Sequence, residues 1–210
     1  MLRLEEVSTP EMAEVLAINA LAPAVINGRL KAFMERSGVP TSETTPPPPP
    51  GIDEPAPDPH DIKFIVNVSA MEGRFYKVRR ARFDCASVLL TVAFDFSRLS
   101  ITQYKQPTHP HTNMAKAALN MMTRTSAGDY AKSRIYMTAV DTGWINDEKP
   151  AAQAAADAAT HNFQTPIDEI DAAARVLDPI IAPMRRIAAG EKDVKPPSGI
   201  FLKDYEPCEW

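Results

Sequence analysis

The 210-residue chain has few cysteines and no long apolar run. Two cysteines cannot build a disulfide framework, which favours a reducing compartment. Charged residues interrupt the first fourteen positions, so we expect no signal peptide there, and no window approaches the ~20 apolar residues of a membrane span. A formal net charge of −4 and a pI near 5.6 argue against a nucleic-acid backbone binder. These absences predict a cytoplasmic protein that has neither a nucleic acid nor a membrane as partner.

Glycine-rich turns are absent as well. The sequence has eight glycines, and none of them is spaced as G-x-G-x-x-G or G-x-x-x-G-x-G. Such a turn holds the pyrophosphate of a dinucleotide against a helix N-terminus. We therefore expect no complete dinucleotide site within this chain, and no metal ligands are assigned.

Proline, by contrast, is abundant, and much of it lies in residues 38–61. A proline-rich run with acids between the prolines favours an extended, water-exposed backbone that cannot build a core. We interpret the segment as a surface loop. The alternative is a ligand for a proline-reading domain, which would make the chain an interaction module.

The remaining sequence predicts strands and helices in alternation. Residues 62–68 are apolar and rich in β-branched side chains, as in a strand buried on both faces of a parallel sheet, and residues 131–140 repeat this pattern. Between them, residues 111–127 read as a helix, which completes a strand–helix–strand crossover. The apolar spacing on this helix predicts one buried face, formed by Met114, Ala118, Met121, Met122 and Thr125. We expect an α/β fold in a single partial domain over residues 1–210. It is part of a doubly wound, Rossmann-like parallel sheet with flanking helices, and it lacks the first strands.

Candidate functional residues lie at the ends of these elements. Ser69 ends the first predicted strand, and Thr112 and Lys116 are four residues apart, so they share one face of the central helix. Asn19 is a polar residue on an otherwise apolar helix. Thr142 and Gly143 follow the second strand, at the edge where open parallel sheets bind ligands.

With these residues in this order, the chain resembles the C-terminal half of the short-chain dehydrogenase/reductase family. The resemblance covers most of the length except the proline-rich loop and residues near 78–103. Asn19 in INALAP matches the family's helix asparagine, Ser69 in IVNVSAMEG its strand-end serine, and Lys116 in TNMAKAALNM its lysine. The family's Pro-Gly pair appears here as Thr142 and Gly143.

The resemblance implies an oxidoreductase that uses NAD or NADP on a small-molecule substrate. Asn19 would support a proton-relay water, Ser69 would polarise the substrate's carbonyl or hydroxyl group, and Lys116 would hold the cofactor ribose. Thr142 and Gly143 would contact the nicotinamide side of the cofactor. The resemblance also implies a homodimer through the helices at residues 10–35 and 111–130.

Two departures from the family pattern weaken the expectation of catalysis. Thr112 stands at the position of the family's tyrosine, and an aliphatic hydroxyl is a far weaker acid than a phenol. His109 or His111 could replace it as proton donor, or both could be surface loop residues, and Lys116 could be an ordinary helix lysine. The nucleotide-binding half also has no counterpart. We therefore expect a truncated form with impaired cofactor binding, and the alternative is a non-catalytic relative that retains the family's dimer face.

Residues 78–103 form an insertion relative to the family. A codon for Val78 begins with the bases that start most spliceosomal introns, and a codon for Gln103 can carry the bases that end them. One hypothesis is therefore an intron translated in frame. The competing hypothesis is a genuine insertion whose apolar run, residues 86–96, forms an extra strand or helix.

Overall fold

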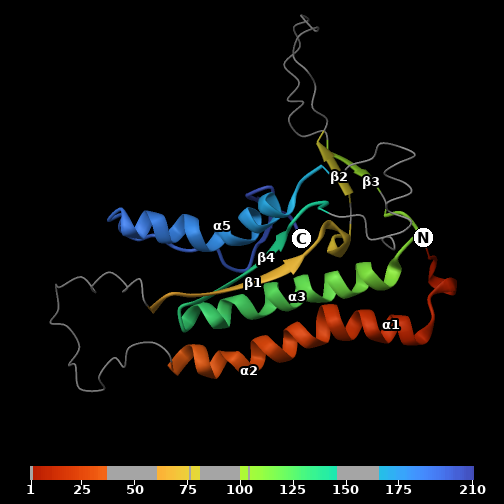
Figure 1. Ribbon diagram of the computed structural model, residues 1–210, viewed down its shortest axis with the longest axis horizontal. Coiled ribbons are helices and arrows are strands. Elements are labelled where there is room, and N and C mark those ends of the chain that lie inside the picture. The colour runs from red at the N-terminus through yellow and green to blue at the C-terminus, as the bar shows by residue number, and fades with distance from the viewer. Residues whose placement is uncertain (1, 37–60, 76, 81–99, 104, 146–165) are drawn as a thin grey trace, which may run out of the picture.

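The computed structural model describes residues 2–36, 61–75, 77–80, 100–103, 105–145 and 166–210. It is an α/β fold with a four-stranded, mostly parallel sheet and helices on both faces, as the sequence predicted (Figure 1). The strands, in their order across the sheet, are β1 (Lys63–Ser69), β4 (Ile135–Asp141), β5 (Phe201–Lys203) and β6 (Glu206–Cys208). The first three run parallel, and β6 returns beside β5 as an antiparallel hairpin.

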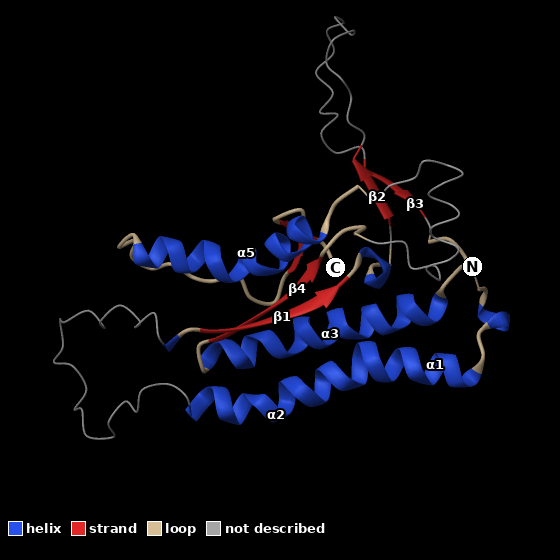
Figure 2. Cartoon of the chain, viewed as in Figure 1, coloured by secondary structure: helices blue, strands red, loops and turns tan. Residues whose placement is uncertain are grey.

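The helices form two layers around this sheet (Figure 2). One layer holds α1, α2 and α3, and the other holds α5. Their bounds are Thr9–Leu16 for α1, Ala22–Arg36 for α2, Pro110–Lys132 for α3 and Glu169–Ala188 for α5. Short helical turns at Leu4–Glu6 (η1), Ala17–Leu21 (η2) and Met71–Gly73 (η4) connect or extend these elements. Within the described residues, none of the helices combines the length and the apolar character that crossing a bilayer requires.

The long N-terminal helix is interrupted by the π-helical turn η2, which the proline after it explains. Pro23 has no N–H to donate to the carbonyl of Asn19, four residues earlier. The chain widens there into a π-helical turn, in which the N–H of Ala22 reaches the carbonyl of Ala17, five residues back. The helix therefore continues past Pro23 through a wider turn centred on Asn19.

The core lies between α3 and the two longest strands. Ala127 and Tyr130 of α3 pack against Ile135 and Met137 of β4, and Ile65 and Met34 close the cluster from β1 and α2. The second strand begins at Ile135, later than predicted, because α3 continues to Lys132 and Arg134 takes a left-handed conformation in the turn.

The buried face of α3 differs from the predicted one. Met114 and Met121 are 50% and 62% exposed, and Ala118 and Thr125 lie on the surface with them. The side chains turned inward are His111, Ala115, Leu119, Asn120, Thr123, Ala127 and Tyr130. The prediction was wrong because polar side chains of this helix find hydrogen-bond partners on β1 and α2, which makes their burial favourable.

Two segments singled out in the sequence are described only at their edges. The ends of the 78–103 insertion lie in strands β2 (Lys77–Arg80) and β3 (Ser100–Gln103), which pair antiparallel in a separate two-stranded sheet. The run at residues 86–96 lies outside the described residues, and so does the proline-rich loop except for Asp61. Both hypotheses about the insertion therefore stay predictions.

Candidate active site

The predicted strand-end serine and helix lysine lie at the same edge of the sheet. Strand β1 carries Ser69 at its carboxyl end, and α3 passes beside this end. The ammonium of Lys116 donates a hydrogen bond to the carbonyl of Val68, 3.1 Å away, one residue before the serine. The fold thus brings together two residues that are 47 positions apart in the sequence numbering, 69 and 116.

The hydroxyl of Ser69 is directed inward. The residue is only 2% exposed, and its Oγ donates a hydrogen bond to Oδ1 of Asn120 at 2.5 Å. The side-chain NH2 of Asn120 is buried and has no hydrogen-bond partner among the described residues. Asn120 was not predicted as a site residue, although its spacing of four from Lys116 places it on the same helical face.

The turn that follows Ser69 is held directly against the backbone of α3. A Cβ atom at Gly73 would lie 2.7 Å from the carbonyl carbon and oxygen of Lys116 and 2.6 Å from Nδ2 of Asn120. Only glycine permits this approach, since two of the three nearest atoms belong to the backbone of α3, which cannot yield. Gly73 therefore sets how closely η4 fits beside Lys116 and Asn120.

Asn19 and Lys116 line one crevice of about 310 Å³ between η2, α2, β1 and α3. Asn19 lies in the π-helical turn, where its Nδ2 donates to the carbonyl of Val15 at 3.1 Å. Asn27 and Asn67 add two further amides, and the remaining walls are apolar. The lining residues are Ile18, Asn19, Pro23, Ile26, Asn27, Val66, Asn67, Val68, Lys116 and Leu119. Ser69 and Thr112 are not among them.

A ladder of buried hydrogen bonds supports the crevice. Nδ2 of Asn27 donates to Oδ1 of Asn67 at 3.0 Å, and Nδ2 of Asn67 donates to the hydroxyl of Thr123 at 2.9 Å. The Thr123 hydroxyl donates in turn to the carbonyl of Leu119, and the Tyr130 hydroxyl donates to the carbonyl of Asn27. The ladder joins α2, β1 and α3, so it holds the amides of Asn27 and Asn67 in fixed orientations.

Thr112 lies in the first turn of α3, one helical turn before Lys116 and partly exposed. Its neighbour His111 is buried rather than a surface loop residue, and its Nε2 lies 3.4 Å from Oε1 of Glu11 on α1. Nδ1 of His111 is buried and has no hydrogen-bond partner among the described residues. His109 precedes the helix in a left-handed conformation, with its ring 6.2 Å from that of His111. Neither histidine lines the crevice.

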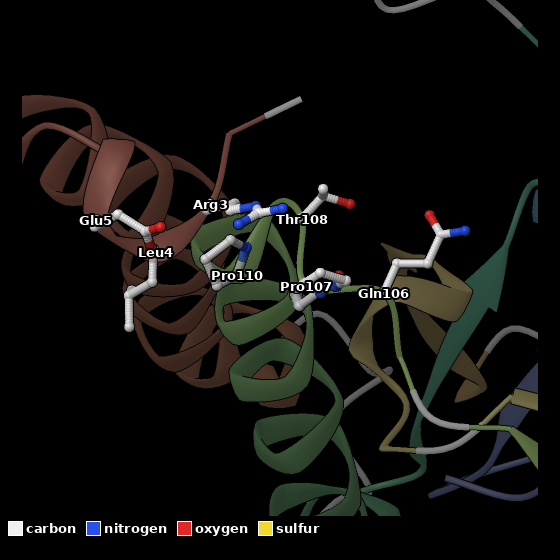
Figure 3. A pocket seen from close by; sticks show the side chains of 8 residues that line it. Arg3, Leu4, Glu5, Gln106, Pro107, Thr108 and Pro110 are labelled. Carbon is white, nitrogen blue, oxygen red and sulfur yellow. The ribbon is translucent and has the colours of Figure 1, made fainter.

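A second cavity, of about 430 Å³, opens at the start of α3 (Figure 3). The N-terminal segment forms one wall, held there by a hydrogen bond from the His109 N–H to the carbonyl of Leu2. On α3 itself, Pro110 and Asn113 line this cavity, and Lys116, three residues on, lines the crevice. The two hollows therefore open at successive turns of one helix, and Thr112 lies in the sequence between the two α3 residues that line the first.

Thr142 and Gly143 follow β4 at the same sheet edge as Ser69, because Ser69 is in register with Asp141. Gly143 has a positive φ of 81°, and its N–H donates to Oδ1 of Asp141 at 3.0 Å. The other oxygen of Asp141 accepts a hydrogen bond from Lys203 at 2.8 Å. Burial alone would lower the pKa of Lys203, but its hydrogen bond to Asp141 and the nearby carboxylates outweigh burial and raise the pKa above the ordinary lysine value.

Comparison with solved structures shows that the fold of this chain resembles part of a known protein. No model of a known protein family matches the chain. Carbonyl reductase Sniffer of D. melanogaster superposes with a TM-score of 0.50 and 14% sequence identity, over 100% of this chain and 61% of that one. The four-stranded sheet and its helices thus match part of the Rossmann fold of a short-chain dehydrogenase/reductase carbonyl reductase.

Two further solved structures are less similar. An NADPH-bound carbonyl reductase from chicken fatty liver gives a TM-score of 0.45 at 17% identity. A Burkholderia multivorans protein described as a short-chain dehydrogenase/reductase with bound NADP gives 0.48 at 15% identity. This chain spans about 60% of the length of each. Among curated proteins, an uncharacterized protein of Acanthamoeba polyphaga mimivirus is 37% identical over 83 residues, which are 37% of this chain and 17% of that protein.

Proposed function

We propose that this chain forms the substrate-side wall of an NAD(P)-dependent oxidoreductase of the short-chain dehydrogenase/reductase type. The observation that carries the proposal is the meeting of Lys116 with the end of β1, beside a crevice that also holds Asn19. In the resemblance these are the residues that hold the cofactor ribose and support a proton-relay water. Thr142 and Gly143 lie at the same sheet edge, where they would contact the nicotinamide.

The crevice fits the nicotinamide–ribose end of a dinucleotide better than the whole cofactor. It offers an ammonium group and three amides in about 310 Å³, which suits hydroxyls and an uncharged carboxamide. The sequence contains no glycine-rich turn for the pyrophosphate. When bound, the nicotinamide supplies hydride transfer, and Lys116 and Asn19 are the residues of this chain that would orient it.

Substrate binding would depend on the neighbouring side chains. Ser69 would polarise a substrate carbonyl or hydroxyl group, and to do so its hydroxyl must turn away from Asn120. Thr112 occupies the proton-donor position with a group of low acidity. We therefore expect slow turnover from this chain as it stands.

The second candidate is a non-catalytic relative that keeps the family's dimer face. Two observations favour it: Thr112 in place of a phenol, and a Ser69 hydroxyl already committed to Asn120. The exposed apolar side chains of α3, which are Met114, Ala118 and Met121, would serve such a protein as an interface. The interaction-module alternative depends on the proline-rich loop, which lies almost wholly outside the described residues.

Cofactor titration of the purified chain separates the two candidates. We expect NADPH or NADH to bind, and Lys116→Met to weaken binding by roughly tenfold or more, the value of a lost charged hydrogen bond. Lys132→Met is the matched control, since Lys132 lies on the same helix, far from the crevice, and is 78% exposed. Calorimetry or quenching of protein fluorescence measures the affinity.

Equal affinities for the parent, Lys116→Met and Lys132→Met would refute the role of Lys116. A chain that binds neither nucleotide at millimolar concentration would leave the non-catalytic relative as the better description. Gel filtration of the same samples then shows whether the helical face mediates self-association.

A further inference from the structure

A buried arginine lies between η4 and the C-terminal hairpin. Arg74 is only 7% exposed, and none of the ion pairs among the described residues gives it a carboxylate partner. Its Nε is buried and has no hydrogen-bond partner in the described part of the chain. A buried guanidinium without an anion is costly, so an anion is expected beside it.

The group beside it is a thiol. Nη1 of Arg74 donates to Sγ of Cys208, 3.1 Å away. Cys208 lies on β6, the last strand of the sheet, and is partly exposed. Its register partner Phe201 is fully buried and stacks on Trp210, with ring centroids 6.1 Å apart. The hairpin therefore fixes the sulfur at the guanidinium, and the partial exposure of Cys208 leaves it open to small reagents.

We propose that Cys208 is a peroxide-sensitive thiol that is activated by Arg74. The guanidinium lies within hydrogen-bond distance of the sulfur, where it stabilises the negative charge that the nucleophilic form of cysteine carries. An ordinary surface cysteine has no buried cation held beside its sulfur by the fold. No residue of the crevice at Lys116 takes part, so this inference is independent of the proposed oxidoreductase function.

The reaction is oxidation by a small hydroperoxide. The thiolate sulfur attacks one oxygen of the peroxide, a sulfur–oxygen bond forms and the oxygen–oxygen bond breaks. The leaving alkoxide or hydroxide takes a proton from water, so that sulfur loses two electrons and the peroxide is reduced to an alcohol or water. The sulfenate product adds an oxygen acceptor beside a guanidinium whose Nε–H has no partner among the described residues.

The test uses the full chain carrying Cys85→Ser, which leaves Cys208 as its sole thiol. Hydrogen peroxide is added at pH 7, the sulfenic acid is trapped with dimedone, and the rate is followed by intact-protein mass spectrometry. We expect Arg74→Met to lower the rate about tenfold, because the variant lacks the cation that stabilises negative charge on the attacking sulfur and on the leaving oxygen. Arg74→Lys keeps the positive charge and should react at close to the parent rate.

The Cys85→Ser chain, which is the parent in these comparisons, also provides a test that does not depend on the folding of any Arg74 variant. Unfolding it in urea exposes Cys208 fully but removes Arg74, so we expect oxidation to become slower. A thiol limited only by access would react faster on unfolding. A faster reaction in urea, or equal rates for the parent and a folded Arg74→Met protein, would overturn the proposal.

Discussion

At the scale of single residues, the candidate site combines family-like positions with two unusual side-chain states. Lys116 reaches the end of β1, whereas the hydroxyl of Ser69 is turned into the protein toward Asn120. Thr112 shares the face of Lys116 but carries an aliphatic hydroxyl. Under the proposed function, Lys116 and Asn19 would serve cofactor binding, and Thr112 would be the weakest element because its hydroxyl is a poor proton donor.

Introducing a phenol at position 112 tests this interpretation. We expect Thr112→Tyr to raise carbonyl reduction by about a hundredfold, the contribution typical of a positioned general acid. NADPH consumption with a panel of small ketones and aldehydes measures the gain. Thr112→Phe is the matched control, since it adds the ring without the hydroxyl, and equal rates for the two variants would contradict the assignment of position 112.

At the scale of elements, two irregular features lie at the candidate site. The π-helical turn η2 carries Asn19, which lines the crevice together with Lys116, and the close approach at Gly73 places η4 on the backbone of α3. Each feature follows from a single residue. Pro23 has no backbone N–H to donate, which widens η2, and Gly73 has no side chain, which lets η4 approach α3. The site therefore depends on how individual helices and turns deviate from regular geometry.

Two glycine substitutions should have opposite effects on stability. We expect Gly73→Ala to lower the free energy of unfolding by roughly 1–3 kcal/mol, because its Cβ would overlap the Lys116 carbonyl. Gly128→Ala, within α3, should raise it by about 0.5–1 kcal/mol, since nothing lies within 4 Å of the added Cβ and alanine favours helix.

Urea unfolding followed by circular dichroism measures both changes. Gly128→Ala also serves as the control for a general effect of the added methyl group. If Gly73→Ala were as stable as the parent, η4 would not be packed against α3 as described.

At the scale of the whole molecule, apolar surface remains exposed on the helical layer. Met114, Ala118 and Met121 form an exposed stripe along α3. Leu21 of η2 and Phe33 of α2 are also on the surface, and the side chain of each is more than 60% exposed. The stripe predicted to face the core thus faces solvent. Exposed apolar surface of this extent is typical of an interaction face, so we propose that residues 10–35 and 111–130 mediate a homodimer.

Light scattering after gel filtration tests the dimer. We expect a dimer for the parent and a monomer for Met121→Glu, because a carboxylate in an apolar contact is strongly unfavourable. Ile170→Glu is the control, since Ile170 is 72% exposed on α5, on the other face of the sheet. A parent that is monomeric, or a dimer unaffected by Met121→Glu, would contradict the proposal.

The sequence by itself determined the type and order of the main elements. β-Branched apolar runs favour buried strands, and a stretch of strong helix formers between two such runs favours a helical crossover, so β1, α3 and β4 could be predicted. The sequence also placed Thr142 and Gly143 at the edge of the sheet where Ser69 ends its strand, since parallel strands end together there.

Only the tertiary structure decided which polar groups are buried and what they contact. Asn120 and Thr123 lie inside because Ser69 and Asn67 meet them, and Arg74 meets a cysteine 134 positions away. A polar side chain is stable inside a protein only with a partner, and that partner is supplied by elements distant in the sequence. Helical spacing alone therefore favoured the methionine stripe of α3, which in the folded chain faces outward.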